Sequence, residues 1–204
     1  MTAEDPHTRS SPIAGGTSPT QKTRLKERLG VSEEVLTDAV DLYEEVVQTE
    51  AGPYHEEALP IAVLYIAIRQ QGVARNIEEV ASAADVSPRR VYRAAQYVSD
   101  ELEQGIPPAS PEIYVARLAQ EVDLSEELER EALRILSEAK AADYHSGRNP
   151  EGVAASAVYA AVTLHDGPVT QRELAAATSV NVRTIRYGYE RMLELAKSPD
   201  DDSS

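Results

Sequence analysis

The residues of this chain that are best placed to bind a partner are concentrated in the stretch TQRELAAATSVNVRTIRYGYERML, residues 170–193. Thr170 is followed three residues later by Glu173, and this spacing predicts the start of a short helix, because each side chain can satisfy a backbone N–H of the other residue. Thr178 interrupts that helix, and a second helix is predicted to begin near Asn181. The stretch therefore predicts a helix-turn-helix.

The second of these helices has an apolar side and a polar side. Its predicted inward residues, at spacings of three and four, are Val182, Ile185, Tyr189, Met192 and Leu193. Its outward residues near the N-terminal end are Arg183, Thr184, Arg186 and Tyr187. A recognition helix inserts this end into the major groove of DNA. The pattern therefore indicates DNA binding, and the alternative is that these residues are ordinary solvated surface side chains.

The overall charge at first argues against nucleic acid, because the formal net charge is -15. The chain has only four Lys but 16 Arg, and acidic residues occur along every predicted helix. This composition is typical of proteins adapted to high salt. Residues 166–197, in contrast, contain five basic and four acidic residues, a net of +1. The helix-turn-helix is thus much less acidic than the rest of the chain.

Composition and motifs exclude several other functions. The chain has no Cys, which excludes disulfides, thiolate zinc sites and a cysteine nucleophile. Its four histidines, which lack ligand spacing, are His7, His55, His145 and His165. We find no nucleophile beside a base, no glycine-rich phosphate loop, no apolar run of about 18 residues and no signal peptide. The sequence therefore predicts a soluble, intracellular, nucleoid-associated protein without catalytic residues, metal, cofactor or membrane contact.

Helical periodicity runs through most of the chain. Residues 1–20 and 198–204 are predicted to be disordered tails. A nearly all-apolar helix is predicted from His55 to Gln71, at the centre of a bundle. The predicted helix starts elsewhere are at Ser32, Asn76, Ser87-Pro88, Pro111, Ser125 and Pro150.

The order of helices in the first half returns in the second half. An offset of 93 to 94 residues aligns Ser32 with Ser125, Tyr65 with Tyr159, Glu79 with Glu173, Arg89 with Arg183 and Val91 with Ile185. We therefore predict an all-α fold built by tandem duplication of a five-helix unit. The first repeat covers residues 21–105, and the second, which ends in the helix-turn-helix, covers residues 110–197.

With the duplication visible, residues 22–197 resemble the core of the transcription factor B family, archaeal and eukaryotic, which consists of two cyclin-like repeats. The segment GRNPEGVAASAVYAA, residues 147–161, is similar to the family's segment of a basic residue, Ser or Pro, Gly and small residues before a Tyr. The closing helix-turn-helix, residues 169–193, is similar in its Thr184-Ile185-Arg186 and Tyr189. The first repeat matches loosely and lacks the family's basic loop before the central helix.

The resemblance implies that the chain binds the TATA-binding protein on promoter DNA and contacts the element upstream of the TATA box. The residues that it places at DNA are Gln171, Arg172, Arg183, Thr184 and Arg186. Of these, Arg186 is the strongest candidate for a base contact, because a guanidinium can bind guanine O6 and N7 together. Arg183 departs from the family, which usually has a small apolar residue there, and this departure leaves the base preference open.

Six further arginines are candidates for contacting the TATA-binding protein or DNA phosphates. They are Arg69, Arg75, Arg89, Arg90, Arg93 and Arg148, and each could instead pair with a nearby Glu or serve a loop.

Family members also carry an N-terminal, Cys-rich zinc ribbon, whereas about twenty residues without Cys stand in its place here. Contact with RNA polymerase is therefore expected to be indirect, in a trimmed chain, a partner-dependent paralogue or a competitor of the full-length factor. The alternative function is a cyclin-like protein-binding scaffold that does not read DNA.

Overall fold

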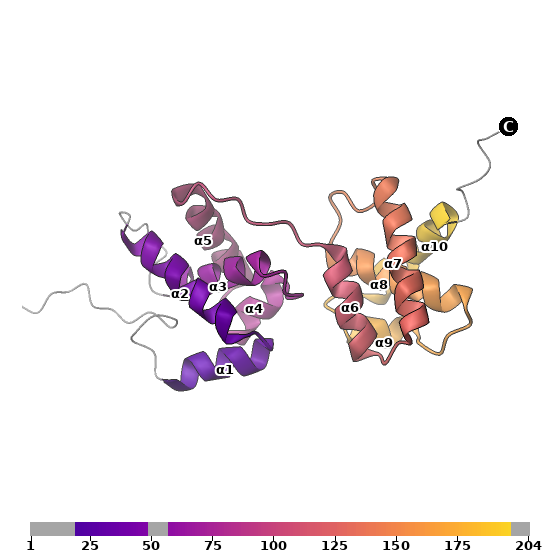
Figure 1. The fold of residues 1–204 in the computed structure, drawn as a ribbon, viewed down its shortest axis with the longest axis horizontal. Helices are drawn as coiled ribbons and strands as arrows, with labels where there is room; N and C mark the ends of the chain where they lie inside the picture. The colour runs from indigo at the N-terminus through magenta and orange to yellow at the C-terminus, as the bar shows by residue number, and fades with distance from the viewer. Residues whose placement is uncertain (1–18, 49–56, 197–204) are drawn as a thin grey trace, which may run out of the picture. The chain divides into compact units, whose positions relative to one another are not determined.

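The computed structural model of the chain describes residues 19–48 and 57–196, and the predicted tails lie almost entirely outside these residues. The described residues form ten α-helices and no strand, which confirms the all-α fold class. The helices divide between two compact units, residues 1–108 and 109–204, with five described helices in each (Figure 1). None of the described helices combines the length and apolar character needed to cross a membrane.

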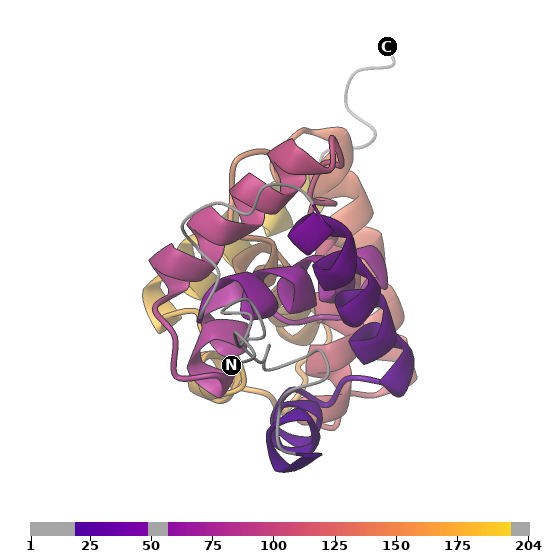
Figure 2. The same cartoon turned by 90° about the vertical axis from the view of Figure 1, so that its left-hand side faces the viewer.

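Unit 1 is built around the apolar helix that the sequence predicts. Its helices are α1 (Pro19–Leu29), α2 (Glu33–Gln48), α3 (Leu59–Gln70), α4 (Ile77–Ala83) and α5 (Pro88–Glu101). Ten of the twelve residues of α3 are buried, and α2, α4 and α5 all contact it (Figure 2). The helix begins at Leu59 with proline in its first turn, so the described part of α3 starts later than the predicted His55, which lies outside the described residues.

Unit 2 has the same order of helices. They are α6 (Pro111–Glu121), α7 (Glu126–Ala141), α8 (Pro150–Leu164), α9 (Gln171–Ala176) and α10 (Val182–Ala196). The central helix is α8, of whose 15 residues 11 are buried, and it contacts each of the other four helices. Each unit thus packs amphipathic helices around one apolar helix, three in unit 1 and four in unit 2, and so buries a core of its own.

Helix starts follow the predicted capping residues. The side chain of Asn76 accepts a hydrogen bond from Glu79 N, and the side chain of Ser125 accepts one from Leu128 N. Ser87 stands at the N-cap of α5 before Pro88, without a side-chain cap hydrogen bond. These caps confirm the predicted starts of α4, α5 and α7, because each lies at the residue named from the sequence.

Candidate nucleic-acid interface

The first helix of the predicted helix-turn-helix is fixed by a capping box. Thr170 Oγ1 accepts a hydrogen bond from Glu173 N at 3.2 Å, and Thr170 N donates to Glu173 Oε2 at 2.7 Å. The pKa of the Glu173 carboxyl is lowered by the hydrogen bond from the Thr170 backbone N–H and then by one from the Thr170 hydroxyl, which donates to Glu173 Oε2 at 2.8 Å. Leu174, fully buried, anchors α9 to the unit. The predicted capping box is thus confirmed, and it sets where α9 begins.

The second helix, α10, is capped by Asn181, whose Oδ1 accepts a hydrogen bond from Thr184 N at 2.9 Å. Ile185 and Met192 are fully buried, as predicted. The prediction that Val182 faces inward is wrong, because its side chain is 38% exposed. Val180, from the turn, is 7% exposed and packs near Gly152 at the start of α8, so it covers the surface that the sequence pattern assigned to Val182.

Helix α10 lies unusually close to α8 where Gly188 meets Ser156. A Cβ added at Gly188 would lie 2.0 Å from Ser156 Oγ and 2.6 Å from Ser156 Cβ. No L-residue with a side chain fits there unless the helices move apart. One turn away, the rings of Tyr159 and Tyr189 meet edge to face with centroids 4.8 Å apart. The position of α10 on α8 is therefore fixed by a glycine, a serine and a tyrosine pair.

The turn between α9 and α10 is attached to α8 by a buried carboxylate. Glu151, in the first turn of α8, is 2% exposed, and the hydroxyl of Ser179 in the turn donates a hydrogen bond to its Oε2. The methyl group of Thr184 lies 3.3 Å from where a Cβ of Gly152 would stand. The start of α8 thus supports both the turn and the first residues of α10. Glu151 was not among the site residues predicted from the sequence, where its only sign is that it is a lone acidic residue at the start of an otherwise apolar helix.

The outer face of α10 carries the residues predicted to contact DNA. Arg183, Thr184 and Arg186 are exposed, and Tyr187 is 61% exposed. The Arg183 guanidinium lies 5.4 Å from the ring centroid of Tyr187. Arg186 Nε lies 3.9 Å from Glu190 Oε1, with the two side chains 70% and 52% exposed. An exposed pair at this distance is weak, so Arg186 can exchange Glu190 for another anion at little cost.

The other predicted contact residues of unit 2 lie on neighbouring segments. Gln171 is partly exposed and Arg172 exposed on α9. Arg148 is exposed in the loop before α8, where its guanidinium lies 4.2 Å from the ring centroid of Tyr144. Stacking on an aromatic ring orients a guanidinium and leaves its N–H groups free to donate.

Two of the six arginines proposed for the TATA-binding protein or phosphates are instead used inside unit 1. Arg69 is 6% exposed, and its Nη2 and Nε donate to the carbonyl of Pro107 at 2.8 and 3.1 Å. Arg75 Nε donates to the carbonyl of Leu29 at 2.6 Å, and its Nη1 lies 3.5 Å from Glu79 Oε1. We therefore remove both from the predicted contact set, because their charged groups already bind backbone oxygens of their own unit.

The remaining predicted contact arginines of unit 1 lie together on the outer face of α5. Arg89, Arg90 and Arg93 are exposed. Arg90 Nη1 lies 2.6 Å from Glu57 Oε2, with the two side chains 59% and 63% exposed. Tyr92, which was not among the predicted contact residues, lies between them and is 54% exposed. Its exposure could have been predicted, because Tyr92 directly follows Val91 and so falls outside the apolar stripe of α5.

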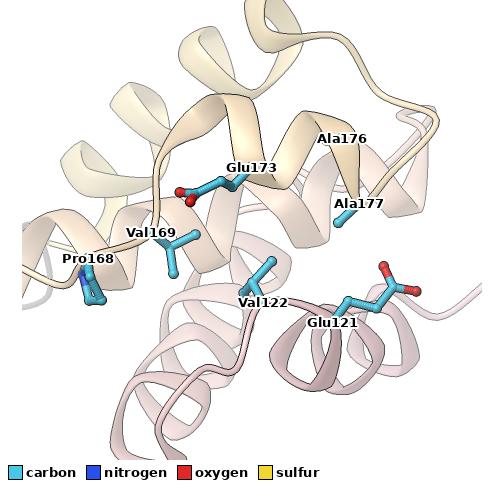
Figure 3. Close-up of a pocket in the computed structure, with 7 residues that line it drawn as sticks. All are labelled: Glu121, Val122, Pro168, Val169, Glu173, Ala176 and Ala177. Carbon is cyan, nitrogen blue, oxygen red and sulfur yellow. The ribbon is translucent and has the colours of Figure 1, made fainter.

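A shallow groove of about 510 Å³ opens beside the helix-turn-helix (Figure 3). Its lining residues are Glu121, Val122, Pro168, Val169, Glu173, Ala176 and Ala177. The groove has an apolar floor and a carboxylate from each of α6 and α9, so an anionic ligand is disfavoured there. The described residues also contain no group of three or more His, Asp or Glu side chains arranged to hold a metal ion.

Comparison with known proteins places this arrangement among transcription factors. Residues 105–195 match the family model described as the transcription factor TFIIB repeat. The chain is 36% identical over 173 residues to transcription initiation factor IIB 2 of Haloferax volcanii, covering 84% of this chain and 52% of that protein. It is 34% identical over 176 residues to transcription initiation factor IIB of Pyrobaculum islandicum, covering 86% and 52%. The chain thus spans about half the length of the curated relatives it matches.

Among solved structures, a viral cyclin from herpesvirus saimiri aligns with 85% of this chain and 80% of its own, at 10% identity and a TM-score of 0.41. The match of the TFIIB repeat model covers the end of the segment between the units and nearly all of unit 2. The match to the repeat model therefore coincides with the unit that contains the helix-turn-helix and its support on α8.

Proposed function

The chain belongs to the transcription factor TFIIB family, and from that premise we propose that it binds the TATA-binding protein on promoter DNA and contacts the element upstream of the TATA box. The observation that carries the proposal is the outer face of α10. Arg183 and Arg186 are exposed there on a helix whose position is fixed by Gly188 and Glu151. A rigid helix that presents arginines is what base recognition in a major groove requires.

In this proposal the contact residues of unit 2 have distinct roles. Arg186 binds a base edge, and Arg183 and Thr184 contact the neighbouring base or the backbone. Gln171 and Arg172 stand at the start of α9, where side chains reach phosphates of the same groove. Arg148 binds a phosphate or the partner protein from the loop before α8.

The partner of unit 1 is proposed to be the TATA-binding protein, with DNA phosphates as the second possibility. Of the arginines predicted to make this contact from unit 1, Arg89, Arg90 and Arg93 on α5 are exposed, whereas Arg69 and Arg75 bind backbone carbonyls of their own unit. RNA polymerase is proposed to be reached through the assembled promoter complex, whose assembly the chain either supports or regulates.

A second function, a protein-binding scaffold, is favoured by the formal charge of -15 and by the acidic groove beside α9. Charge of this sign weakens any contact with DNA phosphates. The two functions differ in what they predict for DNA, because only the first needs the arginines of α10.

A mobility-shift assay with TATA-containing DNA at high salt tests the proposal. The intact chain is expected to form a ternary complex only when the TATA-binding protein is present, and Arg186→Ala is expected to weaken that complex by about tenfold to a hundredfold. Arg191→Ala is the matched control, because Arg191 lies on the same helix, is exposed and pairs with Glu194. Equal complexes with all three proteins would favour the scaffold.

A further inference from the structure

The segment that joins the two units begins by folding back on the end of α5. The N–H of Gln104 donates to the carbonyl of Ser99 at 3.1 Å, a bond of the kind that closes a helix. The hydroxyl of Ser99 donates in turn to the carbonyl of Gln104 at 2.6 Å. Leu102 and Ile106, on either side of this turn, pack against the core of unit 1. The first part of the segment is therefore built into unit 1.

A buried arginine of the central helix holds the same segment further along. Arg69, in α3, is 6% exposed, and its Nη2 and Nε donate to the carbonyl of Pro107 at 2.8 and 3.1 Å. A guanidinium buried to this extent is costly unless its N–H groups find acceptors. Release of Pro107 would take this acceptor away from the guanidinium, so the burial of Arg69 favours the state in which Pro107 is held.

Unit 2 holds the other end of the segment by contacts of its own. Pro111, the first residue of α6, is buried. The hydroxyl of Ser110, just before it, donates to Glu112 Oε2, and Lys140 Nζ on α7 lies 2.5 Å from Glu112 Oε1. One carboxylate thus binds both Ser110 and Lys140, and it fixes the start of α6 to α7.

Between these two sets of contacts lie Pro108 and Ala109. Pro108 is exposed and has no backbone N–H with which to attach itself to either unit. Two residues span at most about 7 Å, whereas the whole segment 102–110 would span about 30 Å if it were extended. The contacts on either side therefore shorten the joint between the units severalfold.

We propose that Arg69 acts as a clamp that confines the joint between the two units to Pro108 and Ala109. The chain up to Pro107 moves as part of unit 1, and the chain from Ser110 moves as part of unit 2. A short joint keeps one unit at a high effective concentration once the other unit is bound, because that concentration falls as a linker lengthens. The clamp is a property of the free chain and needs neither DNA nor a partner protein.

Backbone amide NMR relaxation of the full chain, without any partner, tests the clamp. The order parameters of Ile106 and Ala109 are compared in the parent, in Arg69→Met and in the control Arg75→Met. The control also removes an arginine that donates to a backbone carbonyl of unit 1, that of Leu29 at 2.6 Å. Amide chemical shifts of α3 show whether unit 1 keeps its fold in each variant.

In the parent, the order parameter of Ile106 is expected to be about 0.85, as in rigid backbone, and that of Ala109 to lie below about 0.6. Arg69→Met is expected to lower the value of Ile106 towards that of Ala109, and Arg75→Met to leave it at the parent's value. Equal values at Ile106 and Ala109 in the parent would overturn the inference, and so would a value at Ile106 that stays high in Arg69→Met. If Arg69→Met unfolds unit 1, Arg69→Lys takes its place with the same expected direction, because lysine keeps the charge but lacks the paired N–H groups of a guanidinium.

Discussion

The two units share the order of their helices and an apolar central helix, and three pairs of equivalent positions, at an offset of 94 residues, show how they differ. Where the last helix crosses the central one, unit 1 has Ala62 and Ala94 and unit 2 has Ser156 and Gly188. On the central helix, unit 1 has the buried Arg69 and unit 2 the exposed Thr163. The equivalent helix pair is thus built with two alanines in unit 1 and with a serine and a glycine in unit 2.

The outer faces of the last helices differ in another way. Helix α5 has three arginines around Tyr92, while α10 has two around Thr184 and a Glu190 one turn later. The core positions behind them, Val91 and Ile185, are fully buried in both units. The difference indicates that the buried side of this helix pair preserves the fold, while the exposed side is available to acquire separate binding roles.

The crossing of α8 and α10 is where a substitution should have the largest effect. Gly188→Ala is expected to destabilise unit 2 by about 3 kcal/mol, because the new methyl group would overlap Ser156. The reciprocal Ala94→Gly in unit 1 is expected to cost only about 1 kcal/mol, mostly from helix propensity. Urea unfolding of the full chain, with hydrogen exchange read separately in each unit, measures both effects. Adding Ser156→Gly to Gly188→Ala should restore part of the loss, and no recovery would refute the assigned contact.

The buried arginine of unit 1 should give the next largest effect. Arg69→Met keeps the apolar stem but removes both hydrogen bonds to the Pro107 carbonyl, and we expect a loss of about 2 kcal/mol. At the equivalent place in unit 2, Thr163→Ala should change the free energy of unfolding by less than about 0.5 kcal/mol, because that side chain is exposed. Equal effects at the two positions, measured by urea unfolding, would contradict the assigned difference.

The capping boxes should behave alike in the two units. Asn76→Ala and Thr170→Ala each remove the side-chain acceptor of a helix start, and each is expected to cost about 1 kcal/mol. Hydrogen exchange of the first amides of α4 and α9 reports the two losses separately. A loss in only one unit would show that the capping box does not stabilise its helix equally in the two units.

The smallest effect concerns a carboxylate of unit 1. The two lysines of α1, first Lys26 and then Lys22, lower the pKa of Glu33 from 4.5 to about 2. A lowered carboxyl pKa contributes stability that is present above pH 4.5 and is lost as the pH falls towards 2. An NMR titration should therefore find the Glu33 midpoint well below 4.5, and a midpoint at 4.5 would contradict the contact with the two lysines. Because Glu33 is exposed, Glu33→Gln should change stability only slightly.

Local signals made much of the fold predictable from the sequence. The capping pairs at Asn76 and Thr170, and the prolines that open α5, α6 and α8, each act within one turn of helix, so their residue types alone fix a boundary. The buried central helices were visible as nearly unbroken apolar runs. The outward direction of Arg183 and Arg186 followed from the same periodicity.

What could not be predicted depends on contacts between distant segments. The sequence gives no sign that Arg69 binds a carbonyl 38 residues away, or that Ser179 binds Glu151, 28 residues away. Helical periodicity placed Val182 on the inner side of α10, because the pattern contains no information about the buried side chain of Val180 in the preceding turn. In the sequence, Gly188 is only a residue of low helix propensity. Its close approach to Ser156 becomes visible only in the structure. Partner contacts of the exposed arginines remain predictions for the same reason, since a charge pattern does not identify what binds it.

The central claim, that the outer face of α10 reads DNA while that of α5 does not, is tested most directly by selecting bound sequences from a DNA library randomised upstream of a TATA box. The selection is run with the TATA-binding protein and with the parent chain, Arg186→Ala, and Arg89→Gln combined with Arg93→Gln. Our account predicts a base preference for the parent that is lost in Arg186→Ala and kept in the α5 variant. A preference that survives Arg186→Ala, or that disappears with the α5 arginines, would contradict it.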